Sequence, residues 1–290
     1  MRDQIVAECL PRVEKLRALS RAPGLAVVLD GHDPASEIYV RNKVKLCEDL
    51  GIRSETHTPA ESATTEEIVA LVESLNRRAD IDGILVQMPL PKHVDAKRVL
   101  LAIAPDKDVD GLHPLNLGNL MTGRPGPRPC TPAGVMNLLK RYEIPISGKN
   151  AVVVGRSDLV GKPMAFLLLH ENATVTMCHS KTSDLASVCA RADILVAAIG
   201  RPAFVTADFI KPGATVIDVG MNRLESGARA EAIFGGPTKR TLVGDVHPID
   251  VVEKAGAYTP VPGGVGLLTV AWLMVNTIES AQRRLNGCSA

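Results

Sequence analysis

The stretch Ala151-Val-Val-Val-Gly-Arg-Ser-Asp-Leu-Val-Gly-Lys-Pro-Met164 decides the fold of this chain. Its apolar, mostly β-branched start predicts a buried strand. Two glycines then bracket a short turn, and Pro163 stands where the first turn of a helix accepts a residue without an N–H group. A strand that turns into a helix in this way points backbone N–H groups toward an anion, which the helix dipole also favours. Because the spacing is not G-x-G-x-x-G, the stretch fits either a nucleotide-binding turn or a βα unit that binds nothing.

The segment after the next predicted strand favours a particular nucleotide. Strand Thr174–Cys178 ends in Cys178-His-Ser-Lys-Thr182. In a Rossmann unit that binds NAD, an acidic residue at this place accepts hydrogen bonds from the ribose 2′-OH. Here hydroxyls, an imidazole and a lysine take its place, and Arg156 stands in the glycine turn. Each would be ordinary in a solvated polar loop, but together they suit a 2′-phosphate and predict NADP rather than NAD.

The composition narrows the class of protein. The chain has 290 residues, 46% of them hydrophobic and 22% charged, as in soluble globular proteins. A net charge of +1 lacks the electrostatic footprint of a protein that binds nucleic acid or an anionic membrane. The six cysteines and seven histidines have no ligand spacing, so we expect free thiols in a reducing compartment and no metal site. We find no apolar run long enough for a membrane span and no signal-peptide pattern, and we expect a cytoplasmic protein.

The order of predicted elements indicates two α/β domains. Strands at Leu25–Leu29, Arg53–Thr58 and Gly83–Val86 alternate with helices, which favours a parallel sheet with its ligand site at the carboxyl ends of the strands. Asp3–Ser20 has helical spacing, Asp30–Pro34 is a turn cluster, and Thr64 with Glu67 forms a capping-box pattern. We expect Ser36 and Thr131 to cap the helices that follow them.

We predict a first α/β domain over residues 1–130, completed by a C-terminal helix, 268–290, that packs back on it. The proline- and glycine-rich segment 122–129 leads into a second, Rossmann-type domain over 131–267. Besides the two strands already named, this domain holds predicted strands at Ile194–Ala198 and Thr215–Val219. We expect the two domains to flank a cleft, as doubly wound folds with a ligand at the strand ends do.

Four side chains of the first domain could do chemistry. Tyr39 and Lys43 are four residues apart on one predicted helix, so they share a face. Such a pair is often no more than a surface helix with a lysine extended into water. However, Gln87 follows a predicted parallel strand and Asp110 lies in a loop, and functional groups concentrate at both kinds of place. An aromatic ring, an amine, an amide and a carboxylate could therefore converge above the first sheet, although the sequence does not prove it.

Seven segments resemble the motifs of one family in their residues and in their order along the chain. They are Tyr39-Val-Arg-Asn-Lys43, Val86-Gln-Met-Pro-Leu-Pro91, Lys107-Asp-Val-Asp-Gly111, Pro129-Cys-Thr-Pro132, Val154-Gly-Arg-Ser157, Cys178-His-Ser-Lys-Thr182 and Val261-Pro-Gly-Gly-Val-Gly266. By these motifs the chain resembles the bifunctional methylenetetrahydrofolate dehydrogenase/methenyltetrahydrofolate cyclohydrolase family of one-carbon metabolism. The resemblance spans nearly the whole chain. Two blocks differ from the usual pattern: Leu267-Leu-Thr269 replaces Pro-Met-Thr, and Gly244-Asp-Val-His-Pro248 replaces Gly-Asp-Val-Asp-Phe.

The resemblance implies an NADP-dependent oxidation of 5,10-methylenetetrahydrofolate followed by hydrolysis to 10-formyltetrahydrofolate, by a homodimer. It implies Lys43 as the catalytic lysine, Gln87 as the amide that positions it, and Asp110 as the carboxylate that binds the pterin. Further substrate contacts are implied for Tyr39, which would stack on the folate, and for Pro262 and Gly263. The implied cofactor contacts are Gly155, Arg156 and Ser157 in the phosphate-binding turn, Ser180 at the 2′-phosphate, and the backbone of Met221.

Two other functions fit the same architecture. One is a different two-domain NADP oxidoreductase, such as a shikimate-type dehydrogenase. The other is a non-catalytic NADP-binding regulator, in which the face of Tyr39 and Lys43 would be a docking surface. A regulator would not need Lys43, Gln87 and Asp110 together, and an assay with tetrahydrofolate derivatives separates the two enzymes.

Overall fold

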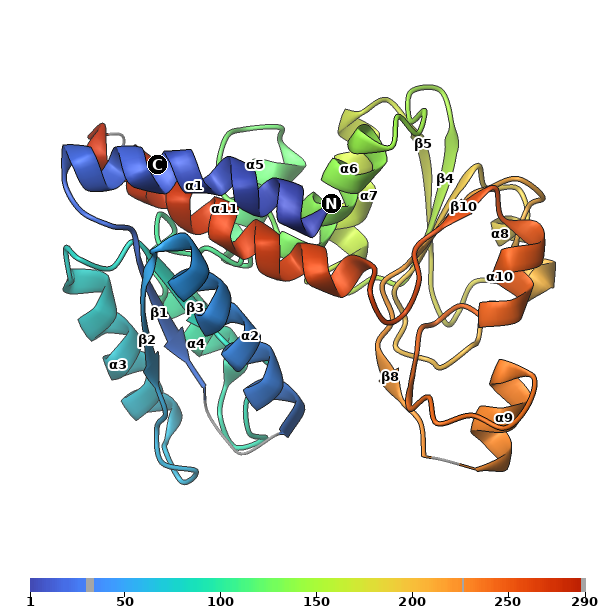
Figure 1. Ribbon diagram of the computed structural model, residues 1–290, viewed down its shortest axis with the longest axis horizontal. Coiled ribbons are helices and arrows are strands. Elements are labelled where there is room, and N and C mark those ends of the chain that lie inside the picture. Colours follow the sequence, from blue (N-terminus) through green and yellow to red (C-terminus); the bar gives the residue numbers. More distant parts are fainter. Residues whose placement is uncertain (30–33, 226, 288–290) are drawn as a thin grey trace. The chain divides into compact units, whose positions relative to one another are not determined.

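The computed structural model describes residues 1–29, 34–225 and 227–287, and for residues 34–39 the backbone alone. The chain forms two compact units (Figure 1). Unit 1 comprises Met1–Cys130 together with Val270–Ala290, and unit 2 comprises Thr131–Thr269. The predicted turn at residues 30–33 and the side chain of Tyr39 lie outside the described residues.

Unit 1 is built on a parallel sheet in the order β2-β1-β3, with β1 at Gly24–Val28, β2 at Arg53–His57 and β3 at Gly83–Val86. β1 and β3 are completely buried, as their continuous apolar sequences predict for strands covered on both faces. The helices of this unit that precede β3 are α1 (Arg2–Leu19), α2 (Pro34–Leu50) and α3 (Thr65–Arg77). In α1 the buried side chains are those of the predicted spacing, Ile5, Cys9, Val13 and Leu16.

The predicted helix starts have different outcomes. The capping box of α3 is confirmed, because the Thr64 hydroxyl accepts from the N–H of Glu67 and the Glu67 carboxylate accepts from the N–H of Thr64. Ser36 and Thr131 are not caps, since α2 begins at Pro34 and α6 (Cys130–Arg141) begins at Cys130. Proline is readily accommodated in the first turn of a helix, which allows α2 to start earlier than predicted. The short helices α4 (Ala96–Ala102) and α5 (Pro114–Met121) were not predicted.

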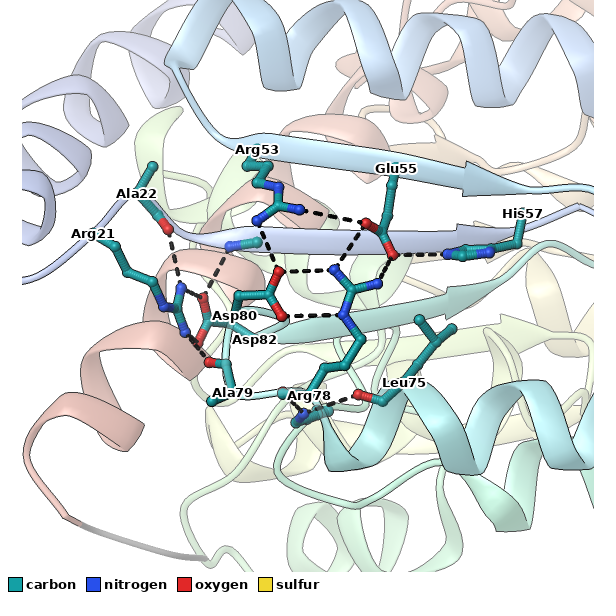
Figure 2. Close-up of polar contacts among 12 residues, drawn as sticks. Arg21, Ala22, Arg53, Glu55, His57, Leu75, Arg78, Ala79, Asp80 and Asp82 are labelled. Atoms are coloured by element: carbon teal, nitrogen blue, oxygen red, sulfur yellow. Dashed lines mark hydrogen bonds and ion pairs between the residues drawn. The ribbon is translucent and has the colours of Figure 1, made fainter.

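The edge strand β2 is polar and carries an ion-pair network. Figure 2 shows the Arg78 guanidinium between the carboxylates of Glu55 and Asp80, where it lowers the pKa of Asp80 to about 2. His57 Nε2 lies 2.8 Å from Glu55, and Arg53 lies 2.7 Å from Asp80. Charged side chains on an edge strand oppose its pairing with another chain. Ahead of β1 and β3, Arg21 and Asp82 form a further pair, 2.6 Å apart (Figure 2).

Unit 2 contains a five-stranded parallel sheet in the order β10-β7-β6-β4-β5. Its strands are β4 (Asn150–Val154), β5 (Thr174–Cys178), β6 (Ile194–Ala197), β7 (Thr215–Asp218) and β10 (Ala257–Tyr258). Val153 joins the apolar cluster on one face, whereas Val152 and Val154 join the cluster on the other. Both faces are therefore buried, and α7 (Gly161–His170) follows β4 as the opening stretch predicts.

Smaller elements complete unit 2: the helices α8 (Leu185–Cys189), α9 (Ala228–Phe234) and α10 (Pro248–Lys254), the 3-10 turn η1 (Ala207–Phe209), and the antiparallel pair β8 (Asn222–Arg223) and β9 (Leu242–Val243).

The last helix, α11 (Val265–Leu285), starts in unit 2 and runs through unit 1. Within unit 1 the Ser280 hydroxyl donates to the carbonyls of Asp82 and Asp106, at 2.7 and 2.6 Å. The Cys47 thiol lies 3.4 Å from the sulfur of Met274. These contacts confirm that the C-terminal helix packs on the first half of the chain, as predicted.

Candidate functional site

Lys43 and Gln87 are in direct contact in unit 1. The Lys43 ammonium donates to Gln87 Oε1 at 2.8 Å, and the Lys43 residue is only 8% exposed. Gln87 directly follows β3, where its N–H donates to the carbonyl of Val28 in β1. Its side-chain amide donates to the carbonyl of Met88 at 2.8 Å, which turns Oε1 toward the lysine. The amide therefore holds the amine at the carboxyl end of the first sheet.

The surroundings of Lys43 shift its protonation. Burial lowers the pKa of Lys43, while the nearby Asp110 carboxylate and Cys130 thiol oppose that shift. Cys130 is itself buried, and burial raises the pKa of its thiol, with Asp110 adding to the effect. The lysine, the carboxylate and the thiol thus lie close enough to influence one another. A lysine in such a place releases its proton more readily than an exposed one.

The loop that carries Asp110 is held by Asp108, a residue that the sequence reasoning did not single out. The buried Asp108 carboxylate accepts hydrogen bonds from the N–H groups of Gly111 and His113, at 3.1 and 2.8 Å. It also accepts from the Asn116 side chain at 2.8 Å. A signal was present in the sequence, since an Asp in a turn commonly accepts hydrogen bonds from backbone N–H groups that follow it.

The glycine turn of unit 2 has the tight geometry that its sequence predicts. Gly155 has φ +129°, and a Cβ there would overlap the carbonyl of Ala198. A Cβ on Gly161 would overlap the carbonyl of Gly155. The Ser157 hydroxyl accepts from the N–H groups of Val160 and Gly161, at 3.2 and 3.4 Å, and so shapes the start of α7. Neither glycine can carry a side chain, which leaves the backbone open to a ligand at the helix start.

The turn after β5 lies beside this glycine turn. The N–H of Gly155 donates to the carbonyl of Cys178 at 2.9 Å, which joins the two turns directly. The N–H of Lys181 donates to His179 Nδ1, and the N–H of His179 donates to the Thr182 hydroxyl. Arg156, Ser180 and Lys181 are exposed, and residues 179–182 contain no acid. The glycine turn that carries Arg156 and the turn that carries Ser180 and Lys181, on which the prediction of NADP rests, are therefore adjacent in the fold.

A buried pair of carboxylates, Asp218 and Asp245, supports the neighbouring loops and was missed by the sequence reasoning. Asp218 accepts from the N–H groups of Gly220, Asp245 and Val246, at 2.8 to 3.0 Å. Asp245 accepts from the N–H groups of residues 199–201, after β6, at 2.6 to 3.0 Å. Burial raises the pKa of Asp218 to about 7. Asp245 belongs to the motif block Gly244–Pro248, but nothing in the spacing of the chain links it to Asp218.

The remaining predicted contacts lie in unit 2. Met221 follows β7, and its terminal methyl would lie 2.9 Å from a Cβ added to Gly266 at the start of α11. Pro262 and Gly263 are in the loop between β10 and α11, where Gly263 has φ +101°. The described residues contain neither a group of three His, Cys, Asp or Glu residues suited to a metal nor a helix long and apolar enough to span a membrane.

Comparison with known proteins gives the family. The model of the tetrahydrofolate dehydrogenase/cyclohydrolase catalytic domain matches residues 1–110, and that of the family's NAD(P)-binding domain matches residues 129–285. The chain belongs to the tetrahydrofolate dehydrogenase/cyclohydrolase family. The bifunctional protein FolD of Solibacter usitatus is 62% identical to it, over 99% of this chain and 97% of that one. The FolD protein of Koribacter versatilis is 61% identical, over 97% and 94%.

Solved structures of this tetrahydrofolate dehydrogenase/cyclohydrolase family share the fold. The bifunctional FolD enzyme of Campylobacter jejuni is 44% identical, with a TM-score of 0.91 over 98% of this chain and 96% of that one. The Trypanosoma brucei enzyme, solved with NADP cofactor and inhibitor, is 37% identical, with a TM-score of 0.90 over 98% and 95%. Membership of this family of enzymes sets aside both alternatives, the shikimate-type dehydrogenase and the non-catalytic regulator.

Proposed function

We propose that this chain oxidises 5,10-methylenetetrahydrofolate to 5,10-methenyltetrahydrofolate with NADP, and then hydrolyses the product to 10-formyltetrahydrofolate. One observation carries the proposal. A buried lysine with a lowered pKa contacts an amide and lies near a carboxylate, in a chain that matches both family domains. Such an amine suits proton transfer, which the second step requires.

In the first step the chain's own residues bind and orient the folate. Oxidation of a methylene carbon between two nitrogens leaves a cation that both nitrogens stabilise, so positioning of the substrate is the main task. NADP, when bound, accepts the hydride. We assign to Asp110 the binding of the pterin's amino and ring N–H groups, to Tyr39 stacking on the folate, and to Pro262 and Gly263 further substrate contacts.

In the second step Lys43 moves a proton. Water adds to the methenyl carbon as one of its protons passes to the neutral Lys43 amine. The carbon–nitrogen bond to the ring nitrogen then breaks as that nitrogen takes the proton back from Lys43, and the new hydroxyl releases its own proton to solvent to become the formyl oxygen. An ordinary lysine is neutral in only about 1 of 2,500 molecules at pH 7, so the lowered pKa increases the reactive fraction. Gln87 Oε1 holds the amine in place through the 2.8 Å hydrogen bond.

The residues of unit 2 fit NADP. Gly155 and Gly161 leave a cradle that a Cβ would fill, and the N-terminus of α7 favours a phosphate there. We assign the phosphate contacts to Gly155, Arg156 and Ser157, and a backbone contact to Met221. Arg156 and Ser180 would bind the 2′-phosphate, because an exposed cation and a hydroxyl stand where an NAD enzyme has an acid.

We further propose the division of labour and the setting. The first part, 1–130 with 268–290, would bind folate and carry the catalytic lysine, and 131–267 would bind NADP. The net charge of +1 and the free, buried thiols of the five described cysteines support a cytoplasmic protein that does not bind nucleic acid. The homodimer implied by the family resemblance is tested by light scattering, where a monomer would contradict it.

The proposed function is tested with the unmodified protein in two parallel assays. One follows the appearance of NADPH from methylenetetrahydrofolate, and the other follows the loss of methenyl absorbance when methenyltetrahydrofolate is supplied directly. We expect both rates to exceed the spontaneous background. A protein that reduced NADP without hydrolysing the methenyl compound would be a dehydrogenase only, and absence of both activities would refute the proposal.

A further inference from the structure

The C-terminal helix α11 carries a line of polar side chains that follows the Asp110 loop. Asn276, Ser280 and Arg284 are spaced by four residues, so they share one face of a mostly apolar helix. Asn276 and Ser280 are 2% and 0% exposed. Ser280 donates to the carbonyl of Asp106, and Arg284 lies 3.7 Å from the Asp106 carboxylate. This helix face therefore contacts both the segment that leads into Asp110 and Asp82, which precedes β3.

Asn276 holds the backbone immediately before Asp110. Its side-chain amide nitrogen donates to the carbonyl of Val109 at 2.8 Å and to the carbonyl of Arg128 at 2.9 Å. It also lies 3.5 Å from the sulfur of Cys130. An amide nitrogen has two hydrogens, and both are used to join the two loops. The loops are in close backbone contact, since a Cβ on Gly111 would come within 2.6 Å of the nitrogen of Pro129.

Asp108 holds the backbone immediately after Asp110. As described above, its carboxylate accepts from the N–H groups of Gly111 and His113. The chain around Asp110 is thus fixed on one side through a carbonyl and on the other through two N–H groups. These bonds come from different parts of the sequence, residue 276 in α11 and residue 108 in the loop itself.

We propose that Asn276 is a positioning residue for the folate site. By fixing the backbone of Asp110 it sets where the Asp110 carboxylate stands relative to Lys43, and the C-terminal helix becomes part of the substrate site without touching the substrate. The inference rests on the role proposed above for Asp110. Displacements of about 1 Å in a binding group can cost about 100-fold in rate, so a lost backbone bond is enough to be measured.

The test compares Asn276→Ala with Thr277→Val in the full chain. Thr277 is the next residue and fully buried, and among the described residues its hydroxyl bonds only to the carbonyl of Leu273 in the same helix. The control therefore disturbs α11 without reaching the loops. We expect Asn276→Ala to raise the KM for methylenetetrahydrofolate about tenfold, with the KM for NADP unchanged and a melting temperature close to that of Thr277→Val. Asp108→Asn should act in the same direction, because it weakens the hold on the other side of Asp110.

Each outcome is decisive. A rise in the folate KM alone, in both Asn276→Ala and Asp108→Asn, supports the proposal. Kinetics of Asn276→Ala equal to those of Thr277→Val, or equal changes in the KM for folate and NADP, overturn it. If Asn276→Ala does not fold, Asn276→Ser takes its place, and failure of both to fold assigns Asn276 to stability alone. Lack of turnover by the unmodified protein would instead refute the proposed function, and this inference with it.

Discussion

Replacing Lys43 by methionine separates the two proposed activities. Methionine keeps a long apolar stem of similar bulk and removes only the amine. Orientation of the folate for oxidation does not require a proton from this amine, whereas hydrolysis of the methenyl compound does. We therefore expect Lys43→Met to abolish the cyclohydrolase step and to leave measurable, though reduced, dehydrogenase activity.

The size of the effect follows from the site. A positioned acid–base group contributes about 10²- to 10⁴-fold, or about 3–6 kcal/mol at about 1.4 kcal/mol per decade. Stability should change little, because two terms oppose each other. Gln87 Oε1 loses its hydrogen-bond donor, which costs about 1–3 kcal/mol. Burial disfavours the charged form of Lys43 and lowers its pKa, so removing that charge is favourable. A net change near 1 kcal/mol would move the melting temperature by about 2–4 °C.

The assay runs both reactions in parallel on Lys43→Met and on Lys45→Met. Lys45 is an exposed lysine of the same helix, so its variant controls for loss of a positive charge. In the unmodified protein the cyclohydrolase rate should rise with pH through a pKa below the ordinary lysine value of 10.5, and Lys43→Met should lose this rise. A folded Lys43→Met protein that hydrolysed the methenyl compound at the unmodified rate would remove Lys43 from the mechanism.

Three further predictions concern other parts of the chain. Arg156→Ala should weaken NADP binding about tenfold or more and weaken NAD binding much less, since a charge-assisted hydrogen bond to the 2′-phosphate contributes about 1.5–3 kcal/mol; equal effects on the two cofactors in steady-state kinetics would contradict this. Asp218 binds its proton more tightly in the folded state, with a pKa of about 7 against an ordinary 3.8, so unfolding free energy should fall as pH rises between these values. Asp218→Asn should flatten that dependence in urea titrations, and an unchanged slope would show that another group causes it. Lys107→Met should destabilise the chain by about 2–3 kcal/mol, because the buried ammonium donates to the carbonyls of Leu75, Asn76 and Arg78 at the end of α3; an unchanged melting temperature would be the contrary result.

The sequence predicted those features that depend on neighbouring residues. The glycine turn after β4, the capping box of Thr64 and Glu67 and the helical spacing in α1 are all local, and the structure has them. Gln87 could be placed at a strand end by the same reasoning, although its contact with Lys43 required the fold. The short helices α4 and α5 were not predicted from the sequence, because seven or eight residues are too few to show a clear helical periodicity of apolar positions.

The residues that were missed act across long separations. Asn276 reaches the carbonyl of Val109 across 167 positions, and nothing in an apolar helix marks one asparagine as its partner. Asp218 is the last residue of β7, and Asp245 lies just after β9. The fold brings these two chain segments together, so that the N–H of Asp245 donates to the Asp218 carboxylate. The pKa shifts of Lys43 and Asp218 arise mainly from burial, which no local pattern reports.

The division of the chain into two units has a consequence for its synthesis. Unit 2 is one continuous segment, Thr131–Thr269, whereas unit 1 is interrupted and resumes at Val270. Because the chain is made from its N-terminus, every residue of unit 2 has been added before the second segment of unit 1 begins. The carbonyls of Val109 and Arg128 are made early, but their hydrogen bonds to the Asn276 amide can form only after residue 276 has been added. The first unit to begin is therefore the last to be completed, and a ribosome stalled before residue 276 would hold every residue of unit 2 but only part of unit 1.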